Sequence, residues 1–196
     1  MHGLINCSMQ GFVRDSYGQK IWDKVVDEAG LDFKNFEAML HYPDEQTELV
    51  LCASCKVLGK QRDDLLGDLG LYLVSHENTQ SLRRLLRFGG ATYVEFLHSL
   101  NDLHERVRMA IPDMVLPPIT VAQKTNDDYS LKVAAGLPGF GMVLAGLLRA
   151  MGDDYGALVF PDGRDTGQGS AEIDISVLDV SFAEGRQFDL AVAGAE

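Results

Sequence analysis

The chain has 196 residues and a formal net charge of −12, with 46% hydrophobic and 23% charged residues. This balance is ordinary for a soluble globular protein and allows one compact domain or two closely joined subdomains. The acidic charge argues against general binding of nucleic acids or of anionic membrane surfaces, because both favour a basic protein face.

Neither a membrane span nor a secretion signal is predicted. The longest apolar runs, residues 69–75 and 140–148, fall short of the roughly 20 residues that a spanning helix needs. The N-terminus reads MHGLINCSMQGFVRD and lacks the basic start and small-residue cleavage site of a signal peptide. The three cysteines, an odd count, indicate reduced thiols. We therefore expect a cytoplasmic protein.

The first two-thirds of the chain carries apolar residues at helical spacing. Gly30 stands where the second helix needs a residue that tolerates the left-handed conformation at its end. Asn78-Thr79 can cap a fifth helix, and Pro112 stops a sixth. The predicted helices cover residues 1–17, 20–29, 43–57, 61–76, 81–88 and 92–111.

Strands and turns replace helices after Pro117-Pro118. Residues 172–180 alternate apolar and polar side chains, which is typical of a strand with one buried face. The predicted class is α+β, with a helical N-terminal subdomain followed by a four-stranded antiparallel sheet packed with a long helix. Further predicted elements are strands at 119–123, 129–134, 157–160 and 188–192, a loop or wide hairpin at 161–170, and the long helix at 138–151.

His104 is the candidate functional residue that the pattern itself singles out. It stands on an apolar stripe of the predicted helix 92–111, with Leu100, Val107 and Ile111 at steps of three or four. An unpaired buried imidazole costs a few kcal/mol, so this ring needs a partner. A metal ion, a cofactor iron or a backbone carbonyl would each serve, and the pattern leaves all three open.

The segments described above occur together with the motifs MHGLIN, FVRDSYG and FLHSLNDLH. In this combination the chain resembles the H-NOX family of haem-nitric oxide/oxygen binding (HNOB) domains, which includes the sensory domain of soluble guanylate cyclase. MHGLIN and FVRDSYG resemble the first helix of the family. FLHSLNDLH places His104 eight residues after Phe96, as the family places its proximal haem ligand. Pro118 falls where the family has a proline that presses on the haem, and Gly70 falls at a glycine of the distal helix.

One departure concerns the Tyr-x-Ser-x-Arg signature of the family, whose side chains grip the haem propionates. In register with the Gly-Leu that follows, Ser130, Lys132 and Ala134 occupy the three signature positions. Lys132 would replace a bidentate guanidinium clamp with a point charge. Sliding the register by one residue restores only Tyr129 and turns every side chain to the opposite face of the sheet. The resemblance thus implies haem b as the cofactor, without its usual clamp.

The resemblance also implies what surrounds a gas ligand on the haem. Gly139 occupies the position of the tyrosine with which O₂-binding members hold O₂, so NO or CO is expected to bind in preference to O₂. The alternative is a set of ordinary core positions with no ligand. The residues that the resemblance places on the ligand side are Ile5, Met9, Leu73, Gly139 and Val143, while Leu100, Pro118 and Lys132 complete the expected cofactor site around His104.

The remaining motifs are less specific. Cys52 and Cys55 form a C-x-x-C inside a predicted helix without a second ligand pair, so structural thiols are expected and a redox role stays open. Arg83, Arg84 and Arg87 form a basic cluster that is either a solvated helix face or a partner for propionates. No catalytic motif is present, and we expect no enzymatic activity.

These observations favour a single H-NOX-like domain over residues 1–196, with subdomains at 1–60 and 61–180 and a C-terminal extension at 181–196. The function that the resemblance implies is a haem-based sensor of nitric oxide that signals to a separate protein. That partner would be a histidine kinase or an enzyme of cyclic-di-GMP metabolism. The alternatives are a haem-free binding or scaffolding module and a thiol-based redox sensor.

Overall fold

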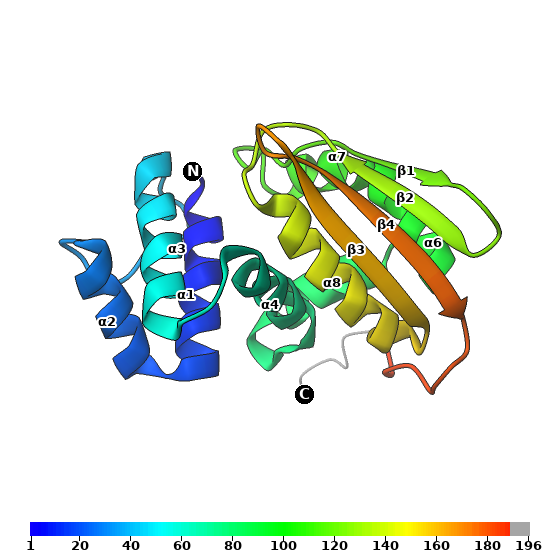
Figure 1. Ribbon diagram of the computed structural model, residues 1–196, viewed down its shortest axis with the longest axis horizontal. Coiled ribbons are helices and arrows are strands. Elements are labelled where there is room, and N and C mark those ends of the chain that lie inside the picture. Colours follow the sequence, from blue (N-terminus) through cyan, green and yellow to red (C-terminus); the bar gives the residue numbers. More distant parts are fainter. Residues whose placement is uncertain (189–196) are drawn as a thin grey trace, which may run out of the picture.

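The computed structural model describes residues 1–188, so the predicted strand at 188–192 lies outside the described residues apart from Phe188. The chain forms two lobes, with α4 (Arg62–Ser75) between them (Figure 1). One lobe is helical, and the other contains a four-stranded antiparallel sheet with helices against it. The predicted α+β architecture is therefore confirmed. No helix within residues 1–188 is long and apolar enough to cross a membrane.

The helical lobe contains α1 (Gly3–Tyr17), α2 (Gln19–Ala29) and α3 (Asp44–Leu58). α1 and α3 pack against α4, and α2 packs against α1 and α3. The side chain of His2 accepts a hydrogen bond from the backbone N–H of Leu4 and so caps α1. Gly30 ends α2 with a φ of 67°, as predicted. Trp22 is fully buried, and its indole N–H donates to the carbonyl of Lys34, which satisfies the buried donor.

The sheet lobe begins with helices and ends with the strands. The strand order is β1-β2-β4-β3, and every neighbouring pair is antiparallel. The long helix α8 leads from β2 to β3 and packs against β3 and β4. The elements are the 3₁₀ turn η1 (Glu77–Thr79), α5 (Gln80–Arg87), α6 (Tyr93–Ser99), the 3₁₀ turn η2 (Leu100–Asp102), α7 (Leu103–Ala110), β1 (Ile119–Gln123), β2 (Asp128–Val133), α8 (Phe140–Tyr155), β3 (Leu158–Gly167) and β4 (Ser170–Asp179).

The sheet has one face in the core and one face in solvent. Ile173 and Ile175 of β4 are buried, as the alternating pattern predicts. Leu131 of β2 stands opposite Ile173 and shares this buried face. The outer face is charged, because Lys132 and Arg164 both form ion pairs with Glu172. This division decides which residues of β2 can reach the interior.

Residues 161–167 belong to β3 and pair with β4, so the hairpin predicted as one alternative for 161–170 is confirmed and the loop is wrong. Pro161 is tolerated because β3 is an edge strand. Gly163 faces α8, where an added Cβ would lie 2.9 Å from the terminal methyl carbon of Met142. Glycine, aspartate and proline normally indicate a turn. In this protein, Pro161 lies in an edge strand and Gly163 lies at a close contact with α8.

The predicted helix 92–111 is broken by η2. Residues three apart eclipse one another in a 3₁₀ turn, so Leu103 follows Leu100 on the buried stripe. Leu100 and Leu103 are 0% and 5% exposed, whereas His104 is only partly buried. The prediction that His104 continues the apolar stripe is therefore wrong, because the residue before it, Leu103, takes that place.

α4 and α8 approach each other closely because glycines lie at their contact. A Cβ on Gly70 would lie 1.9 Å from the carbonyl oxygen of Val143, and a Cβ on Gly146 would lie 1.9 Å from that of Gly67. No side chain fits at these two points. Leu69 of α4 belongs to the core of the helical lobe, while α8 belongs mainly to the core of the sheet lobe. The α4–α8 contact therefore joins the two cores.

Candidate functional site

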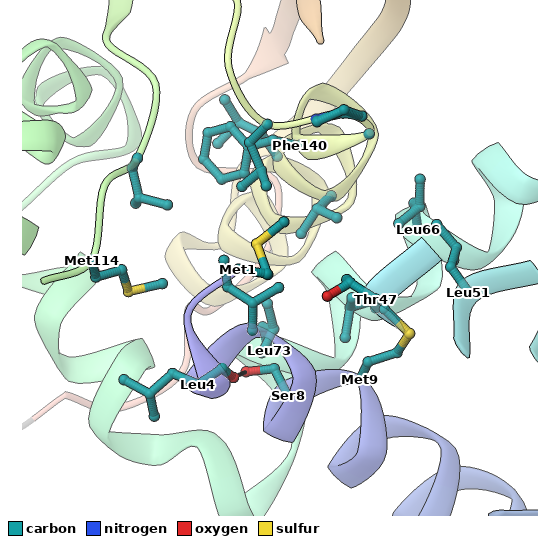
Figure 2. A pocket seen from close by; sticks show the side chains of 18 of the residues that line it. Met1, Leu4, Ser8, Met9, Thr47, Leu51, Leu66, Leu73, Met114 and Phe140 are labelled. Atoms are coloured by element: carbon teal, nitrogen blue, oxygen red, sulfur yellow. Dashed lines mark hydrogen bonds between the residues drawn. The ribbon is translucent and has the colours of Figure 1, made fainter. Parts of the chain in front are cut away.

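A cavity of about 960 Å³ lies between the two lobes. Its walls come from α1, α3 and α4 on one side and from α5, α7 and α8 on the other. In Figure 2, Leu4, Met9 and Leu73 approach from α1 and α4, and Met114 and Phe140 approach from the sheet lobe. This volume and the mainly aliphatic lining suit a small molecule or cofactor with a large apolar body.

Five of the predicted site residues meet at this cavity although they come from three segments that are far apart in sequence. They share an apolar or small side chain, and they are Ile5, Met9, Leu73, Gly139 and Val143. Further aliphatic residues of the lining were not singled out from the sequence, namely Leu66, Leu69, Leu144 and Leu147. Their helical spacing along α4 and α8 is visible in the sequence, but the same spacing is expected of residues that only pack one helix against another.

The wall formed by α1, α4 and α8 presents no tyrosine or histidine within the described lining residues. Two hydroxyl groups of the cavity lining, those of Ser8 and Thr47, already donate hydrogen bonds within the protein. Ser8 Oγ donates to the carbonyl of Leu4 at 2.8 Å. Thr47 Oγ1 donates to Asn6 Oδ1 at 2.8 Å. Apart from Arg62 at the N-terminal end of α4, this wall is therefore an apolar surface for any molecule in the cavity.

Gly139 caps the N-terminus of α8 in the left-handed conformation, with a φ of 82°. A Cβ at this position would lie 2.6 Å from Cδ1 of Leu66. A tyrosine here would have a strained backbone and would have to displace that leucine. Both the conformation and the packing are thus adapted to glycine.

His104 lies beside the cavity and is not among the residues that line it. The α7 part of the wall is formed by Leu103, Val107 and Ile111. The Nδ1 of His104 hydrogen-bonds to the backbone carbonyl of Leu116. Because a carbonyl only accepts, Nδ1 carries the proton in the neutral ring, and Nε2 keeps its lone pair. One of the three partners left open by the sequence, the backbone carbonyl, is present.

Three other predicted site residues also lie away from the cavity lining. Leu100 is fully buried in the core of the sheet lobe. Pro118 is exposed, whereas Pro117 before it is buried. Lys132 lies on the outer face of the sheet, where its Nζ is 3.7 Å from Glu172 Oε1. Turning that lysine inward would require a shift of the β2 register by one residue.

Charged side chains gather at the end of the cavity formed by the first turns of α3 and α4. They are Asp44, Glu45, Glu48 and Arg62. Arg62 donates from both Nη atoms to the Glu48 carboxylate, with Nη2 2.9 Å from Oε2. This bonding lowers the pKa of Glu48 below its ordinary value. No sequence pattern pointed to Arg62, because the pairing depends on how α3 and α4 pack.

Cys52 and Cys55 are free thiols, and two arginines of the basic cluster pair with an aspartate. Burial raises the pKa of both Cys52 and Cys55, which keeps them mainly in the thiol form at neutral pH. Arg83 Nε lies 2.7 Å from Oδ1 of the buried Asp154, and Arg87 Nε lies 3.6 Å from Oδ2. Neither arginine lines the cavity.

The sequence matches the family model described as Haem-NO-binding over residues 2–159. Soluble guanylate cyclase 89Db of Drosophila melanogaster is 22% identical over 155 residues, which cover 79% of this chain and 23% of that relative. Soluble guanylate cyclase gcy-31 of Caenorhabditis elegans is 23% identical over 149 residues, which cover 76% of this chain and 21% of that relative. The chain thus spans about a fifth of the length of these relatives.

Solved H-NOX structures share the fold. The Fe(II) unliganded H-NOX protein from K. algicida has a TM-score of 0.76 and 19% identity, and the match covers 96% of this chain and 100% of that chain. The H-NOX protein from S. oneidensis in the Fe(II)NO ligation state has a TM-score of 0.76 and 15% identity, covering 91% of this chain and 100% of that chain.

Proposed function

Because this chain belongs to the haem-NO-binding family, we propose that it is a haem-based sensor that binds nitric oxide and signals to a separate protein. When bound, haem b would supply an iron that takes up NO or CO. No catalytic role is proposed for these residues. The curated relatives are named as cyclases, but this chain matches only about a fifth of their length.

The residues around the cavity fit a porphyrin. The walls are mainly aliphatic over a volume of about 960 Å³, which suits its flat apolar body. His104 would hold the iron through Nε2, since the carbonyl of Leu116 holds the opposite ring nitrogen. Backbone carbonyls hold metal-ligating imidazoles in this way in many metal sites. Ile5, Met9, Leu73, Gly139 and Val143 would face the gas ligand, with Leu100, Pro118 and Lys132 farther from it.

The observation that carries the choice of gas is the lack of a tyrosine or histidine among the described residues that line the α1, α4 and α8 wall. Bound O₂ gains stability from a hydrogen-bond donor, and NO and CO do not depend on one. Gly139 cannot be exchanged for a tyrosine without strain, because its φ is 82° and Leu66 fills the adjacent space. These residues therefore favour NO and CO over O₂.

The test is an absorption spectrum of the haem-reconstituted, reduced protein under NO, under CO and under air. We expect distinct spectra with NO and with CO and no stable complex with O₂. A stable oxygen complex in air would contradict the proposed selectivity. The same spectra from the Gly67→Ala protein serve as a control, since an added Cβ there meets nothing within 4 Å.

The partner is proposed to be a histidine kinase or an enzyme of cyclic-di-GMP metabolism in the cytoplasm. A second candidate function is a haem-free binding or scaffolding module. It is favoured by the position of His104 beside the cavity and by Lys132 on the outer sheet face. Titration with hemin separates the two candidates, because only the sensor forms a stoichiometric complex.

A further inference from the structure

Arg62 holds a special position among the charged groups of the cavity. It is the only lysine or arginine among the described residues that line it. The basic side chains suggested by the sequence are placed elsewhere, with Lys132 paired to Glu172 on the outer sheet face and Arg83 paired to Asp154. The N-terminal ammonium of Met1 also lines the cavity, but it is paired with Asp44 at 2.6 Å. A carboxylate on a molecule in the cavity would therefore find its cationic side chain at Arg62.

We propose that Arg62 receives a carboxylate of the molecule that occupies the cavity. The inference rests on the proposed function, since a haem propionate is the carboxylate that a haem sensor would bring. Arg62 already donates from both Nη atoms to the Glu48 carboxylate, which shows that its guanidinium can bind a carboxylate in bidentate geometry. Glu48 then acts as a built-in competitor that occupies Arg62 until the ligand arrives.

The acidic residues at the same end do not prevent this exchange. The Asp44 side chain is 78% exposed, so water screens its charge. Glu45 is also exposed. Arg62 is more enclosed, with 36% of its side chain exposed, and its interaction with a carboxylate at the cavity is correspondingly stronger. Because one ion pair replaces another, the net preference for a carboxylate ligand should be modest, about fivefold in Kd.

The test uses iron-free protoporphyrin IX and its dimethyl ester, which has the same ring without free carboxylates. Fluorescence titration gives the ratio of the two dissociation constants for each protein. The unsubstituted chain should bind the free acid about fivefold more tightly than the ester. Arg62→Gln should bring the ratio near one, and Glu48→Gln should raise it because the competing carboxylate is gone.

Arg84→Gln is the matched control, since Arg84 is an exposed arginine on α5 that does not line the cavity. It should leave the ratio unchanged. An Arg62→Gln protein that keeps the original ratio would overturn the proposal. The proposal would also be overturned if the unsubstituted protein bound neither porphyrin, or bound both with the same dissociation constant. Because these porphyrins carry no iron, a failure of His104 as the axial ligand would leave this result untouched.

Discussion

Asp15 connects the C-terminal end of α1 to the end of α4. Its Oδ2 accepts hydrogen bonds from the Tyr72 hydroxyl and from Asn78 Nδ2, both at 2.7 Å. His76 Nδ1 lies 3.7 Å from the same oxygen. Burial alone would raise the pKa of Asp15, but these hydrogen bonds and nearby positive charge outweigh it and lower the pKa.

A lowered pKa means that the folded state favours the charged carboxylate. Its contribution is present above the ordinary pKa of about 3.9 and is lost as the pH falls through the lower folded value. Asp15→Asn should therefore reduce the free energy of unfolding at neutral pH by about 1–3 kcal/mol. The difference from the unsubstituted chain should shrink toward about pH 3.

Urea unfolding at neutral and acidic pH measures this effect. Asp27→Asn is the control, because Asp27 is exposed on α2. A loss in Asp15→Asn that stays constant across the pH range would show that the carboxylate charge does not carry the stabilisation.

Single residues were the hardest feature to place from the sequence. His104 and Lys132 both have the chemistry of a haem site, yet one turns out beside the cavity and the other on the opposite sheet face. In each case the residue is displaced by one position from the expected face. The 3₁₀ turn η2 changes the helical spacing before His104, and the register of β2 turns Lys132 to the outer face of the sheet. Sequence spacing fixes a face only if the element is uninterrupted.

At the scale of elements, the contact of α4 with α8 depends on two glycines in particular. Gly70→Ala should lower the free energy of unfolding by about 1–3 kcal/mol, because its Cβ would lie 1.9 Å from the Val143 carbonyl and the helices must separate. Gly67→Ala in the same helix has no neighbour within 4 Å of the added Cβ. It should be neutral or more stable by up to about 1 kcal/mol, because alanine favours the helix.

Denaturant unfolding of the two variants checks this contrast. Equal stabilities for Gly70→Ala and Gly67→Ala would contradict the close packing of α4 and α8. Both substitutions make the same chemical change in one helix, so helix propensity cancels in the comparison.

Most helices and strands could be predicted from the sequence, because their period and end signals agree. Gly30 and the alternation in β4 are examples. The failures have a common cause. Gly163 and Pro161 favour a turn by themselves, and they join a strand only because α8 packs on one side and the sheet ends on the other.

At the scale of the whole molecule, the cavity lies between two hydrophobic cores. The cores touch where α4 meets α8 and leave a space between the lobes beside that contact. Resemblance to a family located five of its lining residues. Arg62 was not found, because it comes near those five only when the helices pack together. The site is therefore a property of the assembled lobes, and its function depends on how His104 relates to it.

The central claim is that His104 holds haem iron at this cavity, and a hemin titration followed by absorption spectroscopy tests it most directly. The unsubstituted chain should bind one hemin per molecule with a Soret band of a histidine-ligated haem. His104→Gly should lose that band, and added imidazole should restore it by filling the vacated space. A His104→Gly protein with an unchanged Soret band in the absence of imidazole would contradict the account.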